Sequence, residues 1–313
     1  MYPWMRFMRG VIDSEDLPLN ISRESLQYNP ILQKIRNAVT KRVLGDLDKL
    51  SRDDEAAFAT FWGQFGAAVK EGLYDGDQHR EAIFKICRFY STHDNNAALT
   101  SLDDYIERMG DDQNEIYYIT GENGEALKTS PQLEGFRANN IEVLFFTDTI
   151  DDFWLQQVTE YKGKTFKSVT KGDIDFKKSA ANDTDENAED KPDHAPFLAQ
   201  LKMILKDDVE DVRVSNRLTD SPVCLIAPDG GVDMHMERVL KINQKYEGTT
   251  KPVLEINTNH ALIQKLEGLS DKNAIEDAAR LLFDQARIIQ GEPPKDQAEF
   301  VRRMSQFMQN GLT

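Results

Sequence analysis

The chain has 313 residues, more than one hydrophobic core usually serves, so two or three domains are expected. Its formal charge of −16 argues against nucleic acid and anionic membranes as principal partners, because both attract basic surfaces. Only two cysteines occur, Cys87 and Cys224, and neither has a metal ligand at close spacing. This usage indicates a reducing cytoplasm rather than a disulfide framework.

The first hundred residues read mainly as helices. Residues 4–12 (WMRFMRGVI) are aromatic and β-branched and predict a strand, but no partner strand lies nearby, which indicates a piece of a longer protein. Apolar residues at helical spacing and capping residues then predict four helices. These helices cover about 30–47, 53–71 and 78–90, with a fourth capped by Ser101. Cys87 falls on an apolar helical face, which favours a core residue over a reactive thiol.

Strands and helices alternate in the following segment. Residues 115–120, 141–147 and 164–169 have strand character. Residues 124–139, interrupted by Pro131, and residues 149–161, capped by Asp148, have helix character. This alternation predicts a parallel sheet covered by helices. Residues 1–170 are therefore interpreted as a helical segment followed by a small α/β layer.

Residues 171–193 form an acidic stretch, too polar to bury a core, and predict a mobile linker or a frayed charged helix. Asp183, Asp185 and Asn187 occupy the first, third and fifth positions of a calcium-loop spacing. However, Ala188 replaces the glycine that the turn needs, and His194 replaces the bidentate glutamate. A calcium site is not expected.

The second half predicts an α+β domain. Strands are expected at 209–215, 222–227 and 252–257, the first two antiparallel because the turn between them is short. Short helices are expected at 197–205, 232–244 and 261–268, and two long amphipathic helices at 271–290 and 296–310. The complete chain is thus assigned to a multidomain α+β and α/β class.

No self-contained active site is visible in the sequence. Gly121–Gly124 lacks the spacing and lysine of a phosphate loop, the five histidines are scattered, and Ser168 with Lys171 matches a nucleophile spacing only by chance. Arg23 is more informative. Its guanidinium, close to a helix N-terminus, suits a phosphate or carboxylate. The alternative is an ion pair with a neighbouring carboxylate that only holds the loop closed.

Several long motifs resemble the ninety-kilodalton heat-shock chaperone family, in its bacterial HtpG branch. The matching segments are DSEDLPLNISRE (13–24), FWGQFG (61–66), KEGLYDGD (70–77), IYYITG (116–121), SPQLEGFRANNIEVLFFTDTIDDF (130–153) and RVSNRLTDSPVCLI (213–226). The resemblance covers essentially the whole chain. It implies an ATP-dependent chaperone of the stress response that binds unfolded proteins as a homodimer.

The resemblance also implies a domain arrangement. Residues 1–170 correspond to the second part of a middle domain, 171–193 to a linker, and 194–313 to a C-terminal dimerisation domain that ends in helices of a four-helix bundle. Arg23 would reach the γ-phosphate of ATP, with Gln27 beside it. ATP and its Mg²⁺ would be bound by an N-terminal domain outside this chain. The chain itself is expected to hold no cofactor or metal. The chain alone is therefore not expected to hydrolyse ATP.

Two kinds of protein contact follow from the same resemblance. The residues implied in client binding are Asp152, Phe153, Trp154, Gln156, Met234, Met236, Val239 and Leu240. The residues expected at the dimer interface are Leu282, Ile289, Val301, Met304, Phe307 and Met308. For both sets the alternative is packing within the chain's own core. The alternative function is a dimeric scaffold that never meets nucleotide.

Overall fold

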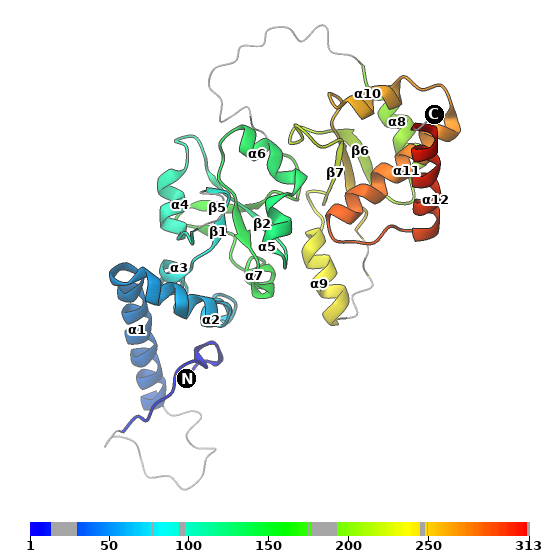
Figure 1. The fold of residues 1–313 in the computed structure, drawn as a ribbon. Coiled ribbons are helices and arrows are strands. Elements are labelled where there is room, and N and C mark those ends of the chain that lie inside the picture. The colour runs from blue at the N-terminus through cyan, green and yellow to red at the C-terminus, as the bar shows by residue number, and fades with distance from the viewer. Residues whose placement is uncertain are drawn as a thin grey trace. The chain divides into compact units, whose positions relative to one another are not determined.

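The computed structural model describes residues 1–13, 30–76, 78–93, 98–174, 176, 193–244, 248 and 250–311, and it is a mixed α/β structure (Figure 1). Among these residues the α-helices are α1 (Pro30–Asp53), α2 (Glu55–Tyr74), α3 (Arg80–Ile86), α4 (Leu102–Arg108), α5 (Gly124–Lys128), α6 (Glu134–Ala138), α7 (Thr149–Trp154), α8 (Ala195–Ile204), α9 (Met234–Gln244), α10 (Ala261–Glu267), α11 (Lys272–Ile289) and α12 (Gln297–Gly311). Two 3₁₀ helices are η1 (Pro3–Met5) and η4 (Pro131–Leu133).

Eight strands form two small sheets in the described part of the chain. The strands are β1 (Tyr90–Ser91), β2 (Glu115–Thr120), β3 (Leu144–Phe146), β4 (Glu160–Tyr161), β5 (Lys164–Ser168), β6 (Asp211–Val214), β7 (Val223–Ile226) and β8 (Val253–Ile256). One sheet has the order β1-β3-β2-β5-β4 and the other the order β6-β8-β7. The parallel pairing expected for the first sheet is confirmed for β2 and β5, which align Glu115 with Thr165.

Close contacts divide the chain into two compact units. Unit 1 contains residues 1–109 and 146–164, and unit 2 contains residues 110–145 and 165–313. In unit 1, α2 packs against α1, α3, α7 and η1. Asp54 caps α2 by accepting a hydrogen bond from the backbone of Ala57, and a capping box at Ser101 starts α4 as the sequence predicts. The domain boundaries predicted from the sequence stay a prediction.

The predicted strand at residues 4–12 is wrong. Trp4 and Met5 are both buried within the short helix η1, whereas Val11 is fully exposed. A strand would point these two neighbours to opposite faces, and the tight 3₁₀ turn instead lets both enter the core. Gly72 on α2 makes room for this packing, since a Cβ there would lie 2.9 Å from the Trp4 ring.

The antiparallel directions predicted for β6 and β7 are confirmed, but these two strands do not pair with each other. Strand β8 lies between β6 and β7, parallel to β6 and antiparallel to β7. The short turn between β6 and β7 therefore does not close a hairpin. The chain instead inserts a strand that is distant in the sequence, and turn length carries no signal for such an insertion. Helix α7 is likewise shorter than predicted and ends at Trp154, before β4.

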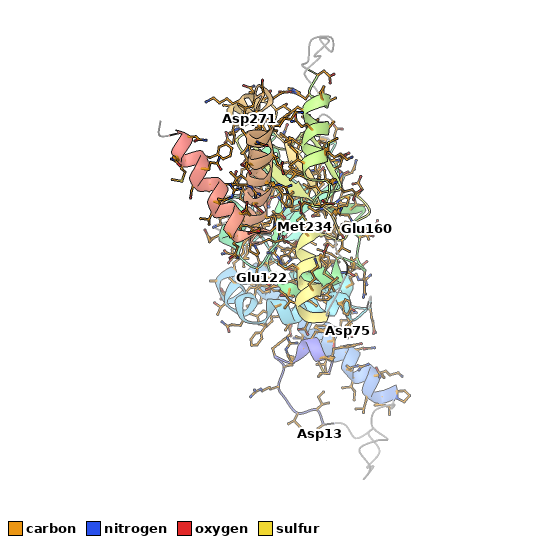
Figure 2. The ribbon with its side chains drawn as sticks, turned by 90° about the vertical axis from the view of Figure 1, so that its right-hand side faces the viewer. Asp13, Asp75, Glu122, Glu160, Met234 and Asp271 are labelled. Atoms are coloured by element: carbon orange, nitrogen blue, oxygen red, sulfur yellow. The ribbon has the colours of Figure 1, made fainter. Side chains whose placement is uncertain are left out.

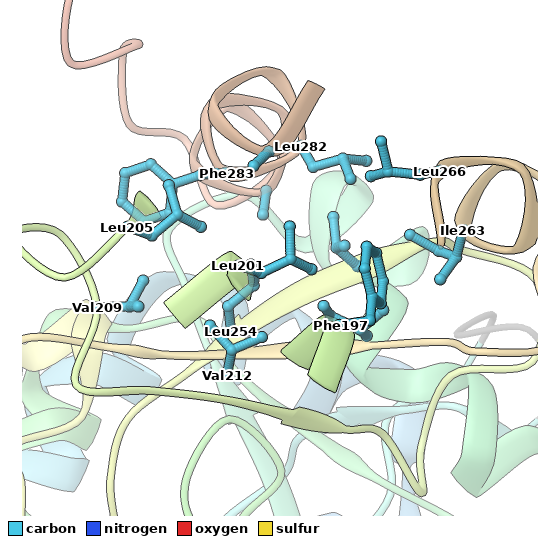
Figure 3. Packing of buried hydrophobic residues seen from close by; sticks show 14 of the residues in the cluster. Phe197, Leu201, Leu205, Val209, Val212, Leu254, Ile263, Leu266, Leu282 and Phe283 are labelled. Carbon is cyan, nitrogen blue, oxygen red and sulfur yellow. The ribbon is translucent and has the colours of Figure 1, made fainter. Parts of the chain in front are cut away.

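The largest core of unit 2 lies between this sheet and the surrounding helices. Buried apolar side chains from α8, α10 and α11 meet those of the three strands (Figure 3). Phe197, Leu201, Leu254, Ile263 and Leu282 are among them. Their burial fixes α11 to the sheet, and α11 contacts both β7 and α8.

A fully buried arginine links two distant segments of unit 2. Arg217 is 1% exposed, and its Nε donates to the Glu255 carboxylate at 2.8 Å. Its two terminal nitrogens donate to the carbonyls of Val169 and Gly172, the latter at 2.6 Å. Glu255 also accepts from Ser215 at 2.8 Å. The buried charge is therefore paired and its donors are satisfied, as burial requires.

A second link uses a carboxylate as a cap for a loop. Glu134 on α6 accepts the backbone N–H groups of Thr219 and Asp220, each at 2.8 Å, and also the N–H and hydroxyl of Ser221. Burial acts to raise the pKa of Glu134, but these donors outweigh it and lower the pKa. Nearby, Gln132 donates from its amide to the Leu225 carbonyl of β7 at 3.0 Å.

Candidate functional site

Arg23 and Gln27, the predicted phosphate-contacting pair, lie outside the described residues. Their assignment stays a prediction. Candidate surfaces for protein contact are described, and they occupy three places: helix α7 in unit 1, and helices α9 and α12 in unit 2.

Helix α7 is fixed at its base by a buried lysine. Lys70 of α2 lies 2.6 Å from both Asp148 and Asp151 at the start of α7, and the side chains of Lys70 and Asp151 are fully buried. Burial acts to lower the pKa of the Lys70 ammonium, but the two carboxylates outweigh it and raise the pKa. Asp151 also accepts the indole N–H of Trp154 at 2.8 Å. This network sets the orientation of α7 on α2.

The predicted client residues of α7 differ in accessibility. Trp154 is fully buried and its ring lies 5.7 Å from that of Phe84, and Asp152 is also buried. Phe153 is half-buried, with its ring 6.4 Å from that of Tyr74 in an edge-on arrangement, and Gln156 is exposed. The surface offered here is therefore aromatic, made by Phe153 and the half-exposed Tyr74, whereas Trp154 belongs to the interior.

Helix α9 carries the second predicted set. Met236 and Val239 are buried, whereas Met234 and Leu240 are half-buried. Ile242, which the sequence interpretation did not select, is 73% exposed. Met234 marks the beginning of the helix in Figure 2. The methionine-rich face is thus partly committed to the chain's own interior and partly open.

Two cavities flank α9. One, of about 500 Å³, is bordered by Ile119, Leu127, Met234 and Ile289, and the other, of about 490 Å³, by Phe283 and Pro252 together with Met234. Arg238, Ile242 and Gly291 border both. Among the described helices and strands, none packs extensively against α9. Its position therefore depends on a few specific contacts.

The polar contacts of α9, which add to the burial of Met236 and Val239, were not foreseen from the sequence. Asp233, immediately before α9, accepts from the hydroxyls of Ser168 at 2.8 Å and Thr170 at 2.5 Å. Arg238 donates from Nη1 to the backbone carbonyl of Gln290 at 2.9 Å. An aspartate just ahead of a helical pattern is a recognisable capping signal. The partner of a single arginine on a helix, in contrast, cannot be read from spacing.

The predicted dimer residues fall into two groups. Leu282 of α11 is 4% exposed and belongs to the core of unit 2. Ile289 at the end of α11 is 44% exposed, and Val301, Met304, Phe307 and Met308 of α12 are between 36% and 61% exposed. These four side chains recur at helical spacing and form an apolar face on α12. Asp271, at the start of α11, is marked in Figure 2.

The described residues contain no cluster of three or more histidine, cysteine or acidic side chains placed to hold a metal. Cys87 and Cys224 are both buried free thiols. Burial raises the pKa of Cys87 to about 12 and also raises that of Cys224, so neither is a ready nucleophile at neutral pH. The core position predicted for Cys87 is confirmed. None of the helices in the described ranges is long and apolar enough to cross a membrane.

Comparison with known proteins gives a consistent result. A sequence profile of the Hsp90 protein family matches residues 1–313. The chain is 48% identical over 322 residues to the chaperone protein HtpG of Paramagnetospirillum magneticum, covering 99% of this chain and 51% of that protein. It is 46% identical over 319 residues to the HtpG of Roseobacter denitrificans, covering 99% and 51%. It is 42% identical over 315 residues to that of Rickettsia bellii, covering 99% and 50%. The chain thus spans about half the length of these relatives.

Proposed function

Because the chain belongs to the Hsp90 family, we propose that it forms the dimerising and client-contacting part of a bacterial molecular chaperone. The observation that carries this proposal is the apolar face of α12, formed by Val301, Met304, Phe307 and Met308. A contiguous exposed apolar face marks a protein contact. Two copies of α11 and α12 related by a two-fold axis would cover it as a four-helix bundle. A cytoplasmic location accompanies this proposal.

Dimerisation is tested by Phe307→Asp. A carboxylate in the centre of an apolar interface loses its hydration without gaining a partner, so the dissociation constant should rise at least thirtyfold. Sedimentation velocity over a range of concentrations measures it. Gln306→Asp is a matched control, because Gln306 is exposed on the same helix outside the apolar face. Equal dissociation constants for both variants would argue against the α12 interface.

Client contact is proposed at the aromatic surface of α7 and at the open side of α9. Non-native proteins expose apolar segments, and aromatic side chains and methionines adapt well to such segments. Phe153→Ala should weaken binding of fluorescently labelled, reduced and carboxymethylated α-lactalbumin about five- to tenfold, as measured by anisotropy. Tyr90→Ala is the control, because Tyr90 is an exposed aromatic residue on β1. The proposal fails for this surface if the two variants bind the probe equally.

Nucleotide-dependent action is proposed for Arg23 and Gln27. Arginine is suited to stabilise charge on a transferring phosphoryl group, and comparable arginines in GTPases contribute about 10³–10⁵ in rate, an upper bound for this case. When the chain is joined to a matching nucleotide-binding domain with ATP and Mg²⁺, Arg23→Ala should lower ATP turnover while the dimer persists. Unchanged turnover would favour the alternative, a dimeric scaffold that acts without nucleotide.

A further inference from the structure

Arg238 joins helix α9 to the C-terminal end of helix α11. Its Nη1 donates to the Gln290 carbonyl, and Gln290 is the C-cap of α11. The last carbonyls of a helix lack intrahelical partners and carry partial negative charge, so a guanidinium is a favourable donor there. Gly291 follows with φ +80°, and a Cβ at this residue would lie 3.0 Å from Arg238 Nη1. Glycine therefore permits both the turn and the close approach.

The accepting end of this contact is itself anchored. The side chain of Gln290 donates from Nε2 to the Leu225 carbonyl of β7 at 2.7 Å. The carbonyl that Arg238 contacts is thus held against the second sheet. A shift of the end of α11 would move this carbonyl, and the guanidinium of Arg238 would follow it or lose its acceptor.

Helix α9 has room to respond to such a shift. Arg238 borders both cavities beside α9, so the sides of the helix that face these cavities adjoin open space rather than packed side chains. The Asp233 contacts with Ser168 and Thr170 hold the beginning of the helix. Farther along, Met236 and Val239 are buried, and the Glu237 carboxylate accepts the backbone N–H of Thr250 at 3.2 Å. Arg238 adds the contact with the end of α11, so a shift of that end is passed to α9 through this residue.

Ile289, a predicted dimer residue that is 44% exposed, directly precedes Gln290. We infer that Arg238 is a positioning residue that couples formation of the dimer at the end of α11 to the placement of the client-contacting helix α9. The inference rests on the proposed function, because it needs both a dimer and a client. Such coupling is reciprocal: a client bound at α9 strengthens the dimer by the same factor as the dimer strengthens client binding.

The experiment measures the placement of α9 without any client. Ile242→Cys provides a labelling site, since Ile242 is 73% exposed whereas Cys87 and Cys224 are buried. An environment-sensitive fluorophore is attached there in four backgrounds: unchanged, Phe307→Asp, Arg238→Ala, and both substitutions together. The emission should differ between the unchanged dimer and the Phe307→Asp monomer, and Arg238→Ala should remove this difference.

Lys241→Ala is the matched control. Lys241 is a cation on the same helix, and its ion pair, at 2.5 Å, is with Glu237 one turn earlier on α9 itself. With Lys241→Ala the emission difference between dimer and monomer should persist. A difference that also persists with Arg238→Ala would overturn the inference, and so would a dimer whose dissociation leaves the emission unchanged. A chain that is monomeric in every background would instead contradict the proposed dimerisation, and the coupling with it.

A second measurement connects the coupling to client binding. Labelled carboxymethylated α-lactalbumin should bind the dimer at least about fivefold more tightly than the Phe307→Asp monomer, the lower end of typical allosteric coupling. With Arg238→Ala the ratio should approach one, whereas a merely structural role for Arg238 would weaken binding equally in monomer and dimer. An unchanged ratio would contradict the inference. A probe that binds none of the variants would contradict the proposed client contact and leave the emission experiment to decide the coupling.

Discussion

Helices α11 and α12 have similar amphipathic sequences, yet they lie in opposite environments. Leu282 and Phe283 of α11 are buried in the core of unit 2, whereas Val301 and Met308 of α12 are exposed. The two helices contact each other, and one contact between them is polar: Arg303 donates from Nε to Asp277 at 2.8 Å. An amphipathic stripe thus shows that a helix has an apolar face, and does not show whether the covering surface belongs to the same chain.

The largest effect that separates the two helices is expected from core truncation. Leu282→Ala should lower the free energy of unfolding of unit 2 by about 2–5 kcal/mol, since it removes buried methyl groups and leaves a cavity. Met308→Ala should change it by less than about 0.5 kcal/mol. Both are measured by hydrogen exchange of the β7 and β8 amides in the Phe307→Asp background, so that association does not contribute. Similar losses in the two variants would remove the distinction between α11 and α12.

An intermediate effect is expected at the connection between the helices. The buried carboxylate of Asp284 on α11 accepts the backbone N–H of Lys295 at 3.0 Å. Asp284→Ala should lower the free energy of unfolding of unit 2 by about 1.5–3 kcal/mol, the range for hydrogen bonds to charged groups. Asp284→Asn keeps an acceptor oxygen and should cost less. The same amide exchange measures both, and equal losses would show that the charge of the carboxylate, which both variants remove, matters rather than the acceptor oxygen.

A smaller effect is expected from the ion pair between α11 and α12. Arg303→Ala should lower protection of the α12 amides by less than about 1 kcal/mol, because the pair with Asp277 is only partly buried. Arg302→Ala is the control, since Arg302 approaches Asp277 only to 3.9 Å. In 1 M NaCl, which screens the ion pair, the protection of the α12 amides should become the same in the two variants and in the unchanged chain. A salt-insensitive loss would indicate packing by the arginine stem instead.

The smallest effect is a pH dependence within α12. The hydrogen bond from Arg302 lowers the pKa of Glu299 below its ordinary value of 4.5. The contribution of the Glu299–Arg302 contact to the stability of α12 is therefore fully present above pH 4.5, and it is lost as the pH falls through the lowered pKa of Glu299. NMR titration of the Glu299 carboxyl carbon should show the lowered midpoint, and Arg302→Ala should raise this midpoint toward the ordinary value. An unshifted midpoint in the unchanged chain would contradict the contact.

Most of the helices could be predicted from residues close together in the sequence. The predictions that failed concern segments whose partners lie far away in the sequence. The capping box of Ser101 and Asp104 and the break at Pro131 depend on neighbours within a few residues, so they could be predicted. Trp4 was misplaced because aromatic residues suit a strand and a buried turn equally, and α2 decides between them. The insertion of β8 between β6 and β7 depends on pairing across about forty residues.

The residues of the candidate contact surfaces also differ in whether the sequence could predict them. The apolar residues of α9 and α12 were selected by periodicity and resemblance, and α12 does expose its stripe. Lys70, Asp233 and Arg238 were missed, because their partners lie on other elements and a charged residue in a helix ordinarily faces solvent. The apolar run around Lys70, with Val69 and Leu73 beside it, was the one available signal for its burial.

The buried contacts of Arg217 have a consequence for a cleaved chain. Residues up to Phe176 and residues from Asp193 onward are held together without the intervening backbone, through Arg217 with Val169 and Gly172 and through Glu134 with the loop at Ser221. A protease cut between positions 176 and 193 should therefore yield two fragments that copurify. The two fragments would remain associated and keep unit 2 folded, rather than separate from each other.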